Sequence, residues 1–127
     1  MPWINFIAVG GGAVLGAWAR WGLGALWNPV FPTVPLGTLA ANLCGGFLIG
    51  VVIGLAGPLN LSATARLMLT TGFLGGFTTF SAFSAEATTL LLRGQYGWSA
   101  ALIALHVCGS ILMTIIGVLL VRALLAK

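Results

Sequence analysis

The chain has 127 residues, of which 60% are hydrophobic and only 5% are charged, with a mean hydropathy of +1.14. Soluble domains carry about 25% charged residues, so this composition excludes a soluble fold and indicates an all-α integral membrane protein. The net charge of +4 comes from basic residues scattered near the ends of apolar segments. Because no basic patch is formed, a nucleic-acid partner is excluded.

The apolar segments follow one another along the chain with short polar connections. We expect a single membrane domain over residues 1–127, because a span needs about 20 residues and the length accommodates four of them. The spans are predicted at about residues 3–27, 36–56, 62–92 and 98–125. The first segment lacks the basic start and the cleavage site of a signal peptide, so it is predicted to be a mature span.

The first two spans carry small residues at every fourth position, such as Gly12 and Gly16 in one and Gly46 and Gly50 in the other. Residues four apart share a helix face, and small ones let helix backbones approach closely. Arg20 and Asn42 stand in line with these stripes. Polar groups inside a membrane are costly and usually functional. A structural anchor and an electrostatic role stay equally open for Arg20, whereas Asn42 is predicted to offer two amide donors to a pore.

The third span is interrupted by an unusual polar and aromatic stretch. It reads Gly75-Gly76-Phe77-Thr78-Thr79-Phe80-Ser81-Ala82-Phe83-Ser84. Glycine loosens a helix, and freed backbone groups at membrane depth are tolerated only where protein or a water-filled cavity surrounds them. The stretch therefore predicts a helix broken near residues 75–79 that lines an ion or solute pathway.

The rings and charges of the third span favour an anion over a cation. A phenyl ring has a positive edge and a negative face, so the edges of Phe80 and Phe83, together with nearby hydroxyl groups, suit a small anion. A cation pathway normally uses carboxylates, and Glu86 is the single acidic residue of the chain.

The fourth span carries His106, Ser110 and Thr114, which lie four residues apart on one helix face. A polar stripe on an apolar helix should face protein or water. For Ser110 and Thr114, a place on the pathway and interhelical hydrogen bonding are equally favoured. His106 is predicted to be a satisfied buried histidine in preference to a metal ligand.

The basic residues give almost no preferred orientation. With the N-terminus inside, Arg66, Arg122 and Lys127 fall on the cytoplasmic side and Arg20 and Arg93 toward the other side. Positive residues set the orientation of membrane proteins, so this chain is predicted to insert both ways. Oppositely oriented copies would form an antiparallel homodimer, which resembles the inverted repeats of transporters.

The motifs of the first three spans resemble the CrcB/Fluc family of fluoride channels over the whole chain. The motifs are Gly12-x3-Gly16-x3-Arg20-Trp21, Gly37-Thr38-Leu39-x2-Asn42-x3-Gly46-Phe47 and Gly72-x2-Gly75-Gly76-Phe77-Thr78-Thr79-Phe80-Ser81-x-Phe83-Ser84-x-Glu86. The resemblance implies a dual-topology homodimer in the bacterial plasma (inner) membrane that exports fluoride passively and relieves fluoride toxicity. Ala82 departs from the family pattern, which has threonine there.

The same resemblance implies roles for individual residues. Asn42, Phe80 and Phe83 would meet the anion, and the hydroxyl groups of Ser81, Ser84, Ser110 and Thr114 would line its path. A structural sodium ion, which is not transported, would be held by the backbone carbonyls of Gly75 and Thr78.

Two other classes of protein are compatible with parts of the pattern. A proton-coupled exporter of the small multidrug type would need a carboxylate in the membrane, and Glu86 is the only candidate. A non-conducting scaffold would not need the hydroxyl and phenylalanine run. An enzyme is not expected, because the chain has no acid pair, no nucleophile beside a base and no metal cluster.

Overall fold

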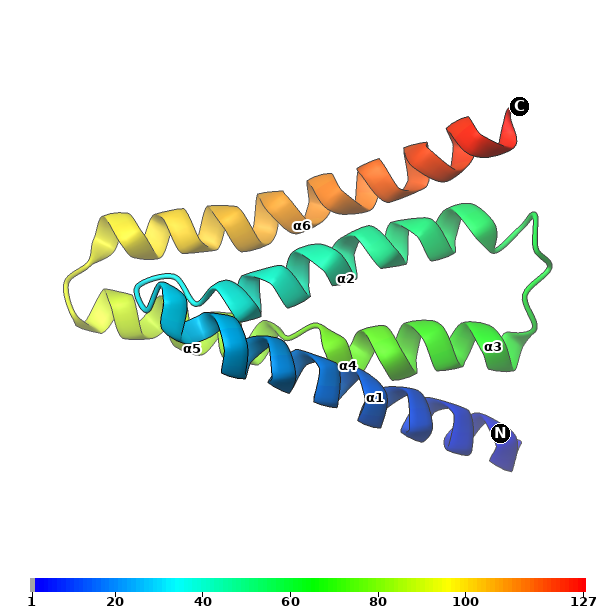
Figure 1. The fold of residues 1–127 in the computed structure, drawn as a ribbon, viewed down its shortest axis with the longest axis horizontal. Helices are drawn as coiled ribbons and strands as arrows, with labels where there is room; N and C mark the ends of the chain where they lie inside the picture. Colours follow the sequence, from blue (N-terminus) through cyan, green and yellow to red (C-terminus); the bar gives the residue numbers. More distant parts are fainter. Residues whose placement is uncertain (1) are drawn as a thin grey trace.

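The computed structural model describes residues 2–127, and within this range the chain forms helices and their connections without any strand. Helix α1 (Trp3–Trp27) is followed by a short 3₁₀ turn, η1 (Asn28–Val30), and by α2 (Leu36–Leu55), and α6 (Tyr96–Leu125) ends the chain. Successive long segments alternate in direction, so that both termini lie at one end of the molecule (Figure 1).

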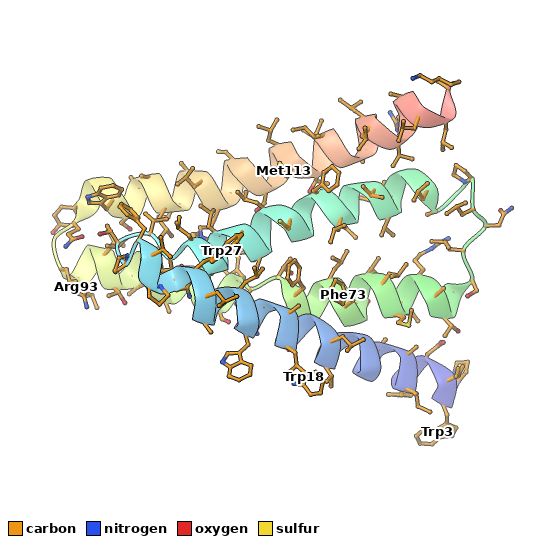
Figure 2. The ribbon with its side chains drawn as sticks, in the orientation of Figure 1. Trp3, Trp18, Trp27, Phe73, Arg93 and Met113 are labelled. Atoms are coloured by element: carbon orange, nitrogen blue, oxygen red, sulfur yellow. The ribbon has the colours of Figure 1, made fainter. Side chains whose placement is uncertain are left out.

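Three helical segments are long and apolar enough to cross a membrane. They are Trp3–Val30, Leu36–Leu55 and Tyr96–Leu125. Their outer faces are also apolar: Trp3 is 82% exposed and Trp18 is 65% exposed, and both side chains point away from the other helices (Figure 2). Large apolar groups on the outside of a bundle belong in lipid, so these features support an integral membrane protein.

The segment between α2 and α6 is a helix in pieces. It comprises α3 (Ala63–Leu67), the π-helical turn η2 (Met68–Leu74), α4 (Gly75–Phe77) and α5 (Phe80–Leu92). Between α4 and α5, Thr78 (φ −87°, ψ 157°) and Thr79 (φ −149°, ψ 116°) are extended. The interruption is therefore narrower than the sequence predicts, because Gly75 and Gly76 stay helical and the threonine pair is extended.

Glycines bring the helices close enough for this arrangement. A Cβ added to Gly16 on α1 would collide with the carbonyl oxygen of Phe73 on η2, and a Cβ on Gly50 of α2 would collide with that of Thr114 on α6. Helix backbones in contact at small residues are typical of membrane bundles. The stripes predicted from the sequence therefore do pack, with α1 against the broken segment and α2 against α6.

Two small clusters of buried apolar side chains lie on either side of the break. One contains Ala41, Leu74 and Phe77, before the break. The other contains Val34, Phe83, Ala87, Leu90 and Leu102, after it. The broken segment is thus packed against its neighbours both before and after the extended threonines.

Candidate functional site

The extended residue Thr79 at the break is paired with a side chain of α2. The amide of Asn42 on α2 accepts a hydrogen bond from the backbone N–H of Thr79 (2.7 Å) and donates one to the carbonyl of the same residue (3.0 Å). Backbone groups of an extended residue inside a membrane bundle have no helical partner, and leaving them unpaired is expensive. Asn42 therefore stabilises the extended conformation from a separate helix.

The hydroxyl of Thr79 caps the N-terminus of α5. Its Oγ1 accepts a hydrogen bond from the backbone N–H of Ala82 at 3.1 Å, as an N-cap residue does. The same oxygen lies 3.3 Å from the hydroxyl of Ser81. On the other side of the break, the Thr78 hydroxyl donates to the carbonyl of Leu74 at 2.8 Å. The threonine pair thus closes α4 and opens α5 with its own side chains.

The break also frees backbone carbonyls at the end of α4. In an uninterrupted helix the carbonyl of Gly75 would accept from the N–H of Thr79, but that N–H points to Asn42 instead. The carbonyl of Gly76 accepts from the Nε of Arg20 on α1 at 3.1 Å. Arg20 therefore lies half-buried against the break and not at the end of its helix. This contact is the anchoring role that the sequence left open for Arg20, and the electrostatic role stays a prediction.

Three rings contact one another in series on the far side of the break. Phe80 and Phe83 on α5 meet edge to face, with ring centroids 5.3 Å apart and planes at 78°. Phe83 then stacks on the imidazole of His106 on α6, with centroids 4.8 Å apart and planes at 26°. Phe83 is buried, whereas Phe80 is 77% exposed. One ring of the predicted pair is thus packed in the bundle and the other projects from it.

The polar stripe of α6 faces α2. The Ser110 hydroxyl lies 3.4 Å from the carbonyl oxygen of Asn42, and the Thr114 hydroxyl donates to the carbonyl of Gly46 at 2.8 Å. Thr114 Oγ1 also lies 2.9 Å from the carbonyl of Ser110. In this chain, both hydroxyl groups join the two helices, which is the packing role that the sequence left open beside a place on the pathway.

A cavity of about 470 Å³ lies at the break and opens on the surface of the single chain. Six of the predicted site residues are among those that line it. They are Asn42, Gly75, Thr78, Phe80, Phe83 and Ser110. Ser81 and Ser84 lie on the exposed side of α5, and Thr114 is half-buried one turn beyond Ser110 on α6. A larger groove of about 880 Å³ between α1 and the broken segment has an apolar lining that contains none of the predicted residues.

Two polar side-chain atoms are buried without a hydrogen-bond partner among residues 2–127. They are Oε2 of Glu86 and Nε2 of His106. Glu86 is half-buried on α5, one turn after Phe83. His106 is 3% exposed, and its Nδ1 lies 2.9 Å from the amide nitrogen of Asn42. Only Nδ1 has a hydrogen-bond partner. The prediction of a buried histidine with its ring nitrogens hydrogen-bonded is therefore correct for the burial and for one of the two nitrogens.

The sequence pointed to Asn42 and to His106 separately but not to their contact. The polar stripe of His106, Ser110 and Thr114 was the available signal. The groups gathered here are amide, hydroxyl, carbonyl and aromatic, and no cluster of acidic, histidine or cysteine side chains that could hold a metal occurs in the described part of the chain. Such an arrangement suits recognition of an ion by dipoles and ring edges.

Comparison with known proteins identifies similar chains. A family model described as "CrcB-like protein, Camphor Resistance (CrcB)" matches residues 7–118. A protein of Nitrosospira multiformis named "Fluoride-specific ion channel FluC" is 58% identical over 116 residues, which cover 91% of each chain. Proteins of the same name from Aromatoleum aromaticum and Pseudomonas putida are 57% and 54% identical, over 88% and 89% of this chain and 86% and 90% of their own.

Proposed function

This chain belongs to the CrcB-like family, and we propose on that basis that it is a fluoride-specific ion channel, through which cytoplasmic fluoride leaves the cell passively. The observation that carries the function is the 58% identity, over 91% of both chains, to a protein named as such a channel. Conduction is not an enzymatic reaction, so the protein is not an enzyme. The proton-coupled exporter is not supported, since the relatives are named for fluoride.

Four membrane spans and an antiparallel homodimer complete the proposal. The broken segment from α3 to α5 runs alongside α1 and α2 and would be the fourth crossing (Figure 1). The cavity at the break is open on one side, and the ring of Phe80 projects from it with 77% of its surface exposed. A second copy in the opposite orientation would close that side, giving two antiparallel pathways in the bacterial inner membrane.

The pathway proposed for fluoride runs along α5 past the break. The edges of Phe80 and Phe83 and the hydroxyl groups of Ser81 and Ser84 would replace water around the anion, and Asn42 would line the path while holding Thr79. Ser110 and Thr114 would join the path only by turning their hydroxyl protons away from carbonyls on α2. Binding at each step must be weak enough for release, and a narrow passage would favour fluoride over the larger chloride.

A structural sodium ion, not transported, fits the carbonyls at the break. The Gly75 carbonyl has lost its helical donor to Asn42, and Thr78 is extended, so its carbonyl leaves the helical direction. Carbonyl oxygens hold a cation without a carboxylate. Gly75 and Thr78 of both copies would hold the ion, and its positive charge would attract anions to the dimer.

The purified protein should therefore unfold at a higher temperature in sodium chloride than in an equal concentration of N-methylglucamine chloride.

Fluoride efflux from liposomes tests the function directly. The purified protein is reconstituted, a potassium ionophore removes the electrical barrier, and an ion-selective electrode follows fluoride with chloride in a parallel series. Rapid loss of fluoride without loss of chloride is expected. A folded protein that releases no fluoride would contradict the channel, and Ala82→Thr would then be the first variant to examine.

A further inference from the structure

His106 is the one histidine of the chain and joins three elements at the break. It projects from α6, is 3% exposed, and lies between Asn42 on α2 and the ring of Phe83 on α5. Its Nδ1 lies 2.9 Å from the Asn42 amide nitrogen, and its Nε2 has no partner in the described residues. The hydrogen bonds around Asn42 determine which of these ring nitrogens carries a proton.

The orientation of the Asn42 amide follows from Thr79. A backbone N–H can only donate, so the atom 2.7 Å from the Thr79 nitrogen must be the amide oxygen of Asn42. The amide nitrogen then faces the Thr79 carbonyl at 3.0 Å, which can only accept. Reversing the amide would set donor against donor and acceptor against acceptor at both contacts. The amide nitrogen of Asn42 is therefore also the atom that faces His106.

The protonation of His106 follows in turn. One amide proton of Asn42 serves the Thr79 carbonyl, and the second points to Nδ1 of His106, which must accept it and so carries no proton. The neutral ring then has its proton on Nε2. A doubly protonated ring would set two buried donors against each other. The carboxyl of Glu86 does not pair with this proton, since its Oε2 and the His106 Nε2 are both unpartnered.

We propose that His106 is a positioning residue that acts through Asn42. As the neutral Nε2–H tautomer, it accepts the second amide proton of Asn42 and so locks the amide in the one orientation that holds both backbone groups of Thr79. Its ring also stacks on the ring of Phe83. This role rests on the proposed function, because a break held in this way keeps the fluoride pathway in its conducting shape.

Three variants distinguish the role of His106 Nδ1 as a hydrogen-bond acceptor from the packing of the His106 ring. His106→Asn places an amide oxygen near the position of Nδ1, whereas His106→Leu has a similar size and no acceptor. Ser99→Ala is the matched control, because Ser99 is 1% exposed on the same helix and donates to the Ala87 carbonyl at 2.9 Å without touching Asn42. In the liposome assay, His106→Leu should lose fluoride flux by about tenfold, and the other two should stay near wild type. Wild-type flux in His106→Leu, or an equal loss in His106→Asn, would overturn the proposal.

A spectroscopic measurement tests the same role without any transport. Because the chain has a single histidine, ¹⁵N NMR of the histidine-labelled protein in detergent reports His106 alone. A protonated Nε2 and an unprotonated Nδ1 are expected near neutral pH, and a proton on Nδ1 would overturn the proposal. If the wild-type protein released no fluoride, the channel function would fail, and the NMR result would still test the protonation of His106 that its contact with Asn42 requires.

Discussion

Asn42 uses both of its amide protons on protein partners, Thr79 and His106. An asparagine that lines a pore can be pictured as a donor waiting for an anion, but here the same donors hold the backbone of the break. The structure therefore gives this side chain a supporting task, and donation to fluoride would require it to give up one of these two hydrogen bonds. At the residue scale, the site is a set of polar groups that restrain one another.

The two phenylalanines of α5 should respond differently to truncation. Phe83→Ala removes a buried ring that stacks on His106 and should lower both fluoride flux and stability, the latter by about 3 kcal/mol. Phe80→Ala removes a ring that is 77% exposed in the single chain and should lower flux with a much smaller effect on the fold of that chain. Liposome flux and thermal unfolding in detergent measure the two effects. Unchanged flux in both variants, in protein that still assembles, would refute the role of the rings.

The residues of the site were predictable to different degrees. The hydroxyl and phenylalanine run marked the third segment because such a composition is anomalous in lipid, and Asn42 stood out because amides are rare there. The contact between Asn42 and His106 joins residues separated by 64 positions. It depends on the relative register of α2 and α6, which hydropathy and spacing do not report, and so it became visible only in the folded chain.

At the scale of elements, the break is defined by its caps. The sequence predicts it near residues 75–79 because glycine weakens helices, and within that range the structure has only Thr78 and Thr79 extended. Glycine permits a break without requiring one. The break is stabilised by the Thr79 hydroxyl, which caps α5, and by the Asn42 amide, which pairs with the Thr79 backbone. The spacing of apolar and polar residues did not predict the π-helical turn η2.

Removal of the cap should weaken α5 without disturbing the other helices. Thr79→Val loses the oxygen that accepts from Ala82 and should destabilise the protein by about 1 kcal/mol, whereas Thr79→Ser keeps that oxygen and should stay near wild type. Thr88→Val, at an exposed position on the same helix, serves as the control for loss of a hydroxyl. Thermal unfolding in detergent compares the variants. Equal stability of Thr79→Val and Thr88→Val would show that the cap contributes nothing.

The close approach of helices makes a second prediction at this scale. Gly16→Ala should destabilise the protein by about 1–3 kcal/mol, because its methyl group would collide with the backbone of η2 near Phe73. Gly22→Ala on the same helix is the matched variant, since nothing lies within 4 Å of the added carbon in the single chain. The ratio of folded to aggregated protein in size-exclusion chromatography, with thermal unfolding, reports the difference. Similar behaviour of both variants would contradict the packing of α1 on the broken segment.

At the scale of the whole molecule, the orientation in the membrane depends on very few charges. Arg66 is in α3, and Arg122 and Lys127 are at the end of α6, so all three belong to the end that carries the termini (Figure 1). Arg93 lies at the opposite end (Figure 2). Arg20 is drawn to the Gly76 carbonyl and so is not a terminal charge. Without Arg20 the count is three basic residues against one, and the proposed insertion in both orientations requires that these few charges do not decide the orientation.

Added charges should therefore fix the orientation. Two lysines appended after Lys127 should place nearly all copies with the termini inside, and fluoride flux should fall because antiparallel partners are missing. Co-expression with a copy that carries lysines beside Arg93 should restore it. Protease digestion of a C-terminal tag in intact and inverted membrane vesicles measures the orientation. Full flux from a population with a single orientation would contradict the antiparallel dimer.

The hold of Asn42 on Thr79 has a consequence for how the protein is made. The chain emerges from the ribosome in order, so α2 is complete before the threonine pair appears, and α6 with His106 comes last. Until α2 and α6 have packed together, the backbone of Thr79 is best satisfied in lipid as part of an ordinary helix. If His106 orients Asn42 as proposed, the break is expected late in biogenesis: the third segment would enter the membrane as a continuous helix and would open only when α6 arrives.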